Sequence, residues 1–225
     1  MATSRPVRTS VIIPAYNEEA GLPIVLKKLF SVIDNSYEVI VVDDGSTDGT
    51  RQVASQFPCT LIVHQTNHGK GEAMKTGIAK AQGDNIIFID ADDTYPVEAI
   101  LDIAKGLESF DMVVGSRMKG QENVPVFNRL GNATFRILIR GLSGFKPRDP
   151  LTGLYGIKKV HLEKIQFDAT GFGVETEIAI KAARMKLRML DLPVEYRRRI
   201  GKAKLNGLRD GWKILSTILK EWLKG

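Results

Sequence analysis

The feature that most constrains the fold is a short apolar run that stops at a group of carboxylates. Residues 86–89 are four consecutive apolar residues, a length and composition typical of a strand buried on both faces. Asp90, Asp92 and Asp93 follow at once. Carboxylates this close together repel one another, so the pattern indicates a cation that offsets the repulsion. A solvated acidic turn is the alternative for an isolated motif, and the neighbouring segments decide between the two.

The first half of the chain alternates between strand and helix patterns. We expect strands at 11–13, 38–42, 61–63, 86–89 and 112–114. We expect helices at 19–33, after an N-cap at Thr47 or Asp48, at 71–81, and at 96–107 with Pro96 as its first residue. Strands joined by helices of this length form a parallel sheet that is covered by helices on both faces. The sequence therefore predicts an α/β fold.

Each predicted strand ends in a polar cluster. The clusters are residues 14–18, 43–46, 67–71, 90–92 and 115–117. Parallel sheets bind ligands at the carboxyl ends of their strands, so we expect these clusters to form one site. Carboxylate oxygens without a nearby group of Cys and His favour Mg²⁺ or Mn²⁺ over zinc. The sequence has neither the dinucleotide-binding nor the P-loop glycine motif, which argues against an NAD-dependent oxidoreductase and a P-loop NTPase.

Charge is distributed unevenly along the chain. Residues 1–116 hold 9 Lys and Arg against 16 Asp and Glu, whereas residues 117–225 hold 23 against 10. The asymmetry indicates that the second half meets an anionic partner, either a membrane surface or a phosphorylated substrate. The sequence shows no zinc-finger spacing and no aromatic-rich basic strand, so nucleic acid is not expected as a partner.

The basic residues of the second half gather in two segments. A predicted helix at 127–142 places Arg129, Arg136 and Arg140 on one face. Residues 196–204 hold five cationic side chains around Gly201, and a guanidinium fork matches a diphosphate. A solvated basic surface is the alternative interpretation for both segments. Between them, we expect a turn at 149–155 that leads into a further strand, and a helix from Glu175 to about residue 183.

The last segment, residues 206–225, predicts an amphipathic helix that follows a domain at residues 1–205. Its apolar stripe consists of Leu208, Trp212, Leu215, Leu219 and Trp222. Such a stripe either lies on a bilayer or docks on the domain, and the sequence does not separate the two. The sequence contains neither an apolar run of 18 or more residues nor a signal-peptide pattern, and its single cysteine, Cys59, fits a reducing compartment. We therefore expect a cytoplasmic protein.

Three motifs, in their order and spacing, resemble those of one enzyme family. They are Pro14-Ala15-Tyr16-Asn17-Glu18, Asp43-Asp44-Gly45-Ser46-Thr47-Asp48-Gly49-Thr50 and Asp90-Ala91-Asp92. Over residues 11–205 the chain resembles the inverting family 2 glycosyltransferases, and within them the dolichyl-phosphate mannose synthases and their polyprenyl-phosphate glucose relatives. The resemblance implies a GT-A fold, which is a Rossmann-like, mostly parallel sheet with helices on both faces, followed here by the C-terminal amphipathic helix.

The resemblance also implies roles for individual residues. Asp90 and Asp92 would hold Mg²⁺ or Mn²⁺, Asp92 and Arg198 would serve catalysis, and Arg117 and Arg129 would hold the acceptor phosphate. The residues that would bind the nucleotide sugar are Pro14, Tyr16, Glu18, Val42, Asp44, Asp90, Ala91, Asp92, Arg117, Arg198 and Lys204.

This sequence departs from the family pattern at two places. In the basic loop, Ala203 stands where the lipid-phosphate branch usually has serine, and Arg199 can take the role given to Arg198. Asp93 stands where mannose synthases commonly have leucine, which leaves the sugar open.

The implied reaction moves mannose or glucose from GDP-mannose or UDP-glucose to dolichyl or polyprenyl phosphate at the cytoplasmic face of a membrane. The protein would reach the membrane through its amphipathic segments or through a membrane-anchored partner subunit. A lipid monophosphate has a second pKa of about 6 and is largely dianionic at neutral pH, so it needs no strong general base. One alternative is a family 2 enzyme with a soluble or protein acceptor. The other is a non-catalytic module that binds a membrane surface.

Overall fold

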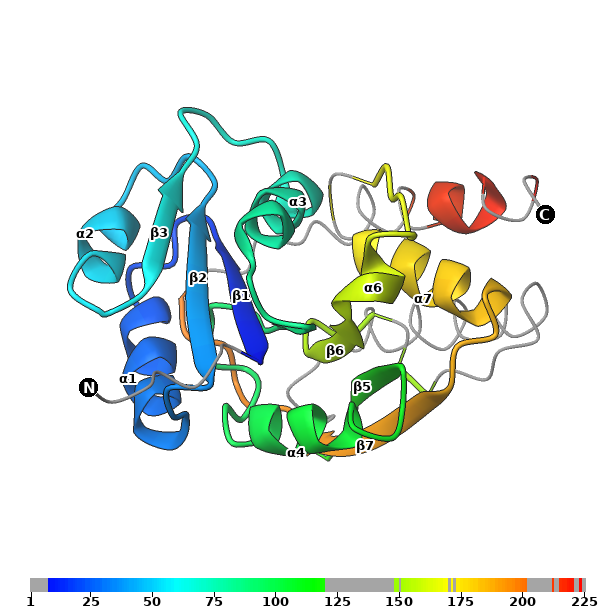
Figure 1. Cartoon of the computed structure of the whole chain (residues 1–225). Helices are drawn as coiled ribbons and strands as arrows, with labels where there is room; N and C mark the ends of the chain where they lie inside the picture. Colours follow the sequence, from blue (N-terminus) through cyan, green and yellow to red (C-terminus); the bar gives the residue numbers. More distant parts are fainter. Residues whose placement is uncertain are drawn as a thin grey trace.

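A seven-stranded sheet forms the centre of the protein (Figure 1). The structure, a computed structural model, describes residues 8–119, 148–149, 151–169, 171, 173–201, 212, 215–220 and 223. The strands are β1 (Thr9–Ala15), β2 (Tyr37–Asp43), β3 (Thr60–Val63), β4 (Asn85–Phe88), β5 (Met112–Lys119), β6 (Tyr155–Lys158) and β7 (Met189–Glu195). The helices are α1 (Leu22–Val32), α2 (Thr50–Ala54), α3 (Lys70–Lys80), α4 (Ala99–Gly106), α6 (Lys159–Leu162) and α7 (Val174–Arg184).

The sheet is mostly parallel, as the sequence predicts. Its strand order is β3-β2-β1-β4-β6-β5-β7, and β6 pairs antiparallel with both β4 and β5. The other neighbours pair in parallel. Tyr155, the first residue of β6, is paired with Phe88, the last residue of β4. The segment that enters β6 therefore lies at the sheet edge where β4 ends.

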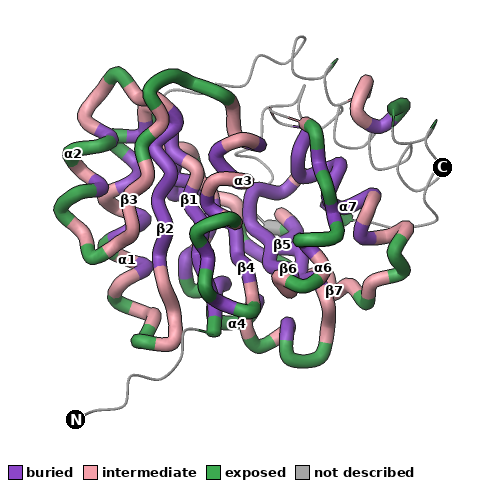
Figure 2. Tube along the Cα trace, turned by 45° about the horizontal axis from the view of Figure 1, so that its top comes forward, coloured by how far each residue is buried: buried purple, intermediate pink, exposed green. Residues whose placement is uncertain are grey.

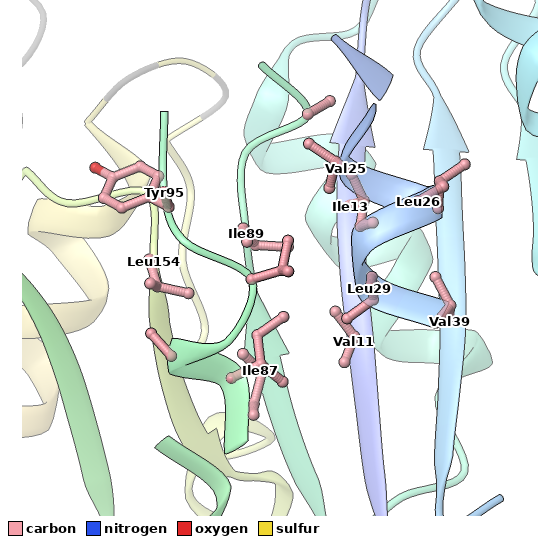
Figure 3. Packing of buried hydrophobic residues seen from close by; sticks show 14 of the residues in the cluster. Val11, Ile13, Val25, Leu26, Leu29, Val39, Ile87, Ile89, Tyr95 and Leu154 are labelled. Atoms are coloured by element: carbon pink, nitrogen blue, oxygen red, sulfur yellow. The ribbon is translucent and has the colours of Figure 1, made fainter. Parts of the chain in front are cut away.

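Helices cover both faces of the sheet, as the sequence predicts. Successive residues of β1 face opposite sides, so Val11 and Ile13 belong to one apolar cluster and Ile12 to the other. The first cluster joins the sheet to α1, α2 and α4, and the second joins it to α3, α6 and α7. In Figure 3, Val25 and Leu29 of α1 lie beside Ile13 and Val11 of β1. The central strands are the most continuously buried part of the trace in Figure 2.

Three predicted helix starts are wrong. The helix expected from residue 19 begins at Leu22. The helix expected from Pro96 begins at Ala99, because the preceding residues form a tighter turn in which the Ala99 N–H donates to the Pro96 carbonyl, three residues back, at 3.2 Å. The N-cap residue of α2 is Gly49 rather than Thr47 or Asp48. The Asp48 carboxylate still accepts a hydrogen bond from the Thr50 N–H at 3.0 Å. Asp48 therefore caps the helix from the position before the N-cap residue.

The described part of the C-terminal segment is helical, as expected. It consists of Trp212, residues 215–220 and Leu223. Ile218 is fully buried, whereas Trp212 and Leu223 are 71% and 78% exposed. Among the described residues of this helix, 215–217 are partly buried and Ile218 is buried, whereas Trp212 and Leu223 leave large apolar side chains uncovered. Among the helices in the described ranges, none combines the length and apolarity that a membrane span requires.

Two further expectations fall on residues outside the described ranges. One is the basic helix at 127–142, and the other is the domain boundary after residue 205.

The core assignment predicts unequal effects of the same substitution at two leucines. Leu26 of α1 is fully buried, whereas Leu101 of α4 is 39% exposed. Leu26→Ala should lower the free energy of unfolding by about 2 to 5 kcal/mol, because it removes buried methyl groups and leaves a cavity. Leu101→Ala should change it by less than about 1 kcal/mol. Urea unfolding followed by circular dichroism measures both, and equal losses would contradict this placement of the core.

Candidate active site

The polar clusters predicted at the strand ends are neighbours at one edge of the sheet. Main-chain hydrogen bonds connect them: the Asp44 N–H donates to the Ala15 carbonyl at 2.8 Å, and the His64 N–H donates to the Asp43 carbonyl at 2.8 Å. β1 lies between β2 and β4, so the segment after β1 has the other two acidic segments on its two sides. The sheet order therefore brings residues 14–18, 43–46 and 90–94 to one place.

Asp92 is buried at this edge and is bound from two sides. Its Oδ1 atom accepts hydrogen bonds from the Thr94 hydroxyl at 2.6 Å and from the Thr94 N–H at 3.2 Å. Its Oδ2 atom accepts a hydrogen bond from Arg199, whose other terminal nitrogen donates to Glu18. Burial raises the pKa of Asp92, and the nearby Asp90 charge raises it further, against the lowering effects of Arg199 and Thr94. Arg199 therefore bridges the ends of β1 and β4.

The basic loop after β7 reaches the site through its main chain as well. The Arg197 N–H donates to the Thr94 carbonyl at 2.8 Å, and the Ile200 N–H donates to the Asp92 carbonyl at 3.1 Å. Of the two arginines that the sequence leaves open, Arg199 is the one that faces the carboxylates, whereas Arg198 is exposed. Lys204 and Arg129, the other predicted phosphate ligands, lie outside the described residues.

Asp90 is paired with a partly buried lysine, Lys70, that the sequence analysis did not assign to the site. The Lys70 ammonium lies 2.5 Å from Asp90 Oδ1 and 2.5 Å from Glu175 Oε1. Burial opposes the charge on Lys70, but the two carboxylates more than offset it and raise its pKa well above the ordinary value. Burial raises the pKa of Glu175. From sequence, Lys70 is indistinguishable from a solvated lysine in a glycine-rich turn.

The entry to β6 supports Asp90 from the other side. A Cβ atom on Gly153 would lie 1.9 Å from Asp90 Oδ2, so the backbone approaches this carboxylate more closely than any residue with a side chain permits. The Gly153 N–H donates to the Tyr95 hydroxyl at 2.8 Å. Tyr155, two residues on, has a buried hydroxyl that finds no hydrogen-bond partner among the described residues. Asp90 is therefore fixed between a lysine and a glycine.

Asp93, the third carboxylate of the group, points away from the other two. It lies 2.6 Å from the Lys28 ammonium of α1 and has a positive φ of 60°. This backbone conformation turns its side chain toward the helix. Asp93 is therefore engaged by α1, and the predicted metal ligands stay Asp90 and Asp92.

Arg117 is already engaged by a carboxylate. Its Nε and Nη2 atoms donate to the two oxygens of Asp149 at 2.5 and 2.6 Å, and both side chains are about nine-tenths buried. Its guanidinium also lies over the ring of Tyr196, 5.2 Å from the centroid. A phosphate that binds Arg117, as predicted, would have to share it with Asp149.

Asp44 is enclosed by the segment after β3. Its Oδ1 atom lies 2.7 Å from His64 Nδ1 and accepts from the His68 N–H at 3.0 Å. Its Oδ2 atom accepts from the Asn67 amide at 2.9 Å and from the Gly69 N–H at 2.7 Å. Asp44 therefore holds this segment in place, and His64, for which the sequence suggests no role, is one of its partners. The predicted contact between Asp44 and a nucleotide stays a prediction.

The remaining predicted residues lie along the same edge. Pro14 and Val42 are opposite each other in the pairing of β1 with β2. Val42 is fully buried in the second apolar cluster, and its predicted contact with a nucleotide stays a prediction. Tyr16 is half-buried, and Ala91 is buried between the two aspartates of the motif.

The donor set of this edge fits a divalent cation. Four carboxylates, those of Glu18, Asp90, Asp92 and Glu175, contact two cationic side chains, Lys70 and Arg199, so negative charge is in excess. Mg²⁺ and Mn²⁺ prefer carboxylate oxygens. Within the described ranges, no three Asp, Glu, His or Cys side chains are arranged to hold a metal. A cation bound by Asp90 and Asp92 would therefore complete its coordination with water or phosphate oxygens, as Mg²⁺ usually does.

Comparison with known proteins gives consistent matches. The model of glycosyl transferase family 2 matches residues 10–165. A dolichyl-phosphate hexose transferase of Haloferax volcanii is 31% identical over 96% of this chain and 94% of its own length. A dolichol-phosphate mannosyltransferase of Pyrococcus furiosus is 32% identical over 89% of this chain, which spans only 60% of that relative.

A solved structure shares the fold. Glucosyl-3-phosphoglycerate synthase from Mycobacterium tuberculosis, in complex with Mn²⁺, uridine diphosphate and phosphoglyceric acid, aligns with a TM-score of 0.80. It is 24% identical, and the alignment covers 96% of this chain and 78% of that one.

The buried pair of Arg117 and Asp149 predicts a difference between single and double variants. Asp149→Ala should lower the free energy of unfolding by about 3 to 5 kcal/mol, because it leaves a buried guanidinium without its carboxylate. Arg117→Met combined with Asp149→Leu should recover most of this loss, since neither charge remains. Urea unfolding of the three proteins measures the effect. A double variant as unstable as Asp149→Ala would show that the pair is not the source of the loss.

Proposed function

The chain belongs to glycosyl transferase family 2, and we propose that it moves mannose or glucose from a nucleotide sugar to dolichyl or polyprenyl phosphate. The observation that carries the proposal is the pair of carboxylates after β4, the partly exposed Asp90 and the buried Asp92, beside a basic loop. The relative from Haloferax volcanii, which is named a dolichyl-phosphate hexose transferase and matches nearly end to end, supports a hexosyltransferase with this acceptor.

In the proposed reaction, the nucleotide sugar binds along the edge formed by β1, β2 and β4. Asp90 and Asp92 would hold Mg²⁺ or Mn²⁺, which would neutralise the charge that develops on the departing diphosphate. The Mn²⁺ and uridine diphosphate of the Mycobacterium tuberculosis enzyme support this assignment on the same fold. Residues on both sides of the pair would contact the nucleotide: Pro14, Tyr16, Glu18, Val42, Asp44 and Ala91. Arg198 or Arg199, together with Lys204, would contact the diphosphate.

The acceptor would be a phosphate that attacks the sugar in a single displacement with inversion. A phosphate monoester is largely dianionic at neutral pH, so the chemistry requires cationic groups that position it more than a base that deprotonates it. Arg117 and Arg129 would supply those charges. Since Arg117 is paired with Asp149, the acceptor phosphate would bind at the outer side of this pair or in exchange for the carboxylate.

A lipid acceptor requires contact with a membrane surface. Trp212, Leu219 and Leu223 in the C-terminal segment and Met118 at the end of β5 are exposed apolar side chains. Aromatic and aliphatic groups of this kind insert into the interfacial region of a bilayer, and cationic side chains favour anionic lipids. We therefore place the protein at the cytoplasmic face of a membrane, bound through these segments or through a membrane-anchored partner subunit.

A soluble phosphorylated acceptor is the second candidate. The structure from Mycobacterium tuberculosis holds phosphoglyceric acid, and its name describes a synthase that makes a glucosylated phosphoglycerate. The same arrangement of carboxylates and arginines would serve that acceptor, and the exposed apolar side chains would then be packing surfaces. A non-catalytic membrane-binding module is the least supported function, because it gives no role to the carboxylates at the sheet edge.

Transfer of a radioactive sugar tests the acceptor. The protein is incubated with Mn²⁺ and labelled GDP-mannose or UDP-glucose, with and without polyprenyl phosphate. We expect label in the organic phase only when the lipid is present and with one of the two donors. Label that stays in the aqueous phase with both donors would overturn the lipid acceptor.

Neighbouring aspartates provide a matched test of the carboxylate pair. Asp92→Asn should lower turnover at least about a hundredfold, because the oxygen that would bind the cation loses its charge. Asp93→Asn should keep most of the turnover, since Asp93 pairs with Lys28 and asparagine tolerates its positive φ. The initial rate of sugar transfer is measured for both variants. Similar rates in the two variants would show that the role of metal ligand is wrongly assigned to Asp92.

A further inference from the structure

The two cations that neutralise the acidic cluster are held in different ways. Lys70 lies between Asp90 and Glu175, and its side chain is 18% exposed. Glu175 is 7% exposed, so withdrawal of Lys70 would leave a buried carboxylate unpaired. Arg199 belongs to the loop after β7, its side chain is 27% exposed, and the loop contains Gly201 in a left-handed conformation with a φ of 89°. Arg199 is the more exposed of the two cations and belongs to a loop, but its partners Glu18 and Asp92 are only 9% and 5% exposed, so it can leave only when another cation takes its place.

Asp92 offers a divalent cation one oxygen, and Arg199 occupies it. The Oδ1 atom already accepts two hydrogen bonds from Thr94. The Oδ2 atom accepts from the Arg199 guanidinium. A cation that binds Asp92 must therefore approach Oδ2, where a positive charge already lies and repels it.

We propose that Arg199 is a displaceable counter-ion of the metal site: it stands in for the divalent cation on Asp92 in the free protein and leaves when the cation binds. This inference rests on the proposed function, because it requires a cation and a nucleotide diphosphate at Asp90 and Asp92. Arg199 holds Glu18 and Asp92 together when no other cation is present. In the free protein, Arg199 is therefore a positioning residue for Glu18 and Asp92. When the nucleotide diphosphate binds, Arg199 becomes its ligand.

The exchange couples the cation to the nucleotide. A cation that arrives alone must displace Arg199 from two carboxylates, which weakens its binding. When a nucleotide diphosphate arrives with the cation, the released guanidinium finds a new anionic partner, and its fork geometry matches the diphosphate oxygens. Cation and nucleotide should therefore bind with positive cooperativity, which is a negative coupling free energy, and Arg199 is its source. Removal of Arg199 should therefore strengthen the binding of the cation alone and weaken the coupling between cation and nucleotide.

Titration with Mn²⁺ tests this exchange directly, with the electron paramagnetic resonance signal of free Mn²⁺ as the readout. Without nucleotide, Arg199→Met should bind Mn²⁺ with a Kd roughly tenfold lower than the wild-type protein, because the competing charge is absent. With GDP or UDP present, the wild-type Kd for Mn²⁺ should fall steeply and that of Arg199→Met should fall much less. A purely structural role for Arg199 would weaken Mn²⁺ binding in both conditions.

Two more variants control the experiment. Arg197→Met removes the same charge from the same loop, but Arg197 pairs with Glu195 at 3.6 Å and should leave the Kd for Mn²⁺ unchanged. Glu18→Gln keeps Arg199 and weakens its hold, so it should lower the Kd by a smaller factor than Arg199→Met. Thermal unfolding checks that each variant is folded, and Mn²⁺ alone should raise the Tm of Arg199→Met more than that of the wild type.

The outcomes separate the inference from the function on which it rests. If Mn²⁺ binds the wild-type protein and Arg199→Met leaves the Kd unchanged or raises it, the exchange is overturned. If Mn²⁺ binds neither protein, with or without GDP and UDP, the proposed function is overturned.

Discussion

The structure depends on how repulsion among carboxylates is compensated at one edge of the sheet. Glu18, Asp90, Asp92 and Glu175 are largely buried there, and each is paired with Lys70 or Arg199. Buried charges are tolerated only when they are paired and hydrogen-bonded. The strands that end in carboxylates can therefore meet at one edge because Lys70 of α3 and Arg199 of the loop after β7 offset two of these four negative charges. The excess that remains is what makes the edge suitable for a divalent cation.

Much of the fold could be predicted because its signals are local. The strands from β1 to β5 are short apolar runs, and each run is followed by polar residues at the same edge. Alternation along β1, with Val11 and Ile13 on one face and Ile12 on the other, follows from the geometry of a strand. The start of α4 could not be placed as well, because Pro96 fits a tight turn before the helix as readily as the first helical position. Nor does the sequence reveal that β6 inserts between β4 and β5, since strand order depends on packing across the whole sheet.

The sequence predicts the site only where the residues that form it are neighbours in the chain. The aspartates after β4 lie at the sheet edge as their position after a buried strand indicates. Their partners come from far away in the chain: Arg199 is 107 residues from Asp92 and 181 from Glu18. Local sequence cannot tell which arginine of the basic loop faces inward, and it cannot tell that Lys70 lies between Asp90 and Glu175. The engagement of Arg117 by Asp149 and of Asp44 by the segment after β3 is equally invisible, because a charged residue looks the same whether its partner is water or another side chain.

The place of Gly153 against Asp90 has a consequence for how the protein acquires its active form. β6 is made long after β4, yet it must lie against β4 before the backbone at Gly153 can seat the Asp90 carboxylate. Glu175, which anchors Lys70, is synthesised later still. A nascent chain that has emerged only through β5 would carry the acidic motif without these supports, and ordering it must wait for pairings that are distant in sequence and slow to form. Catalytic competence is therefore tied to completion of the sheet, so an unfinished polypeptide would not acquire a working centre on the ribosome.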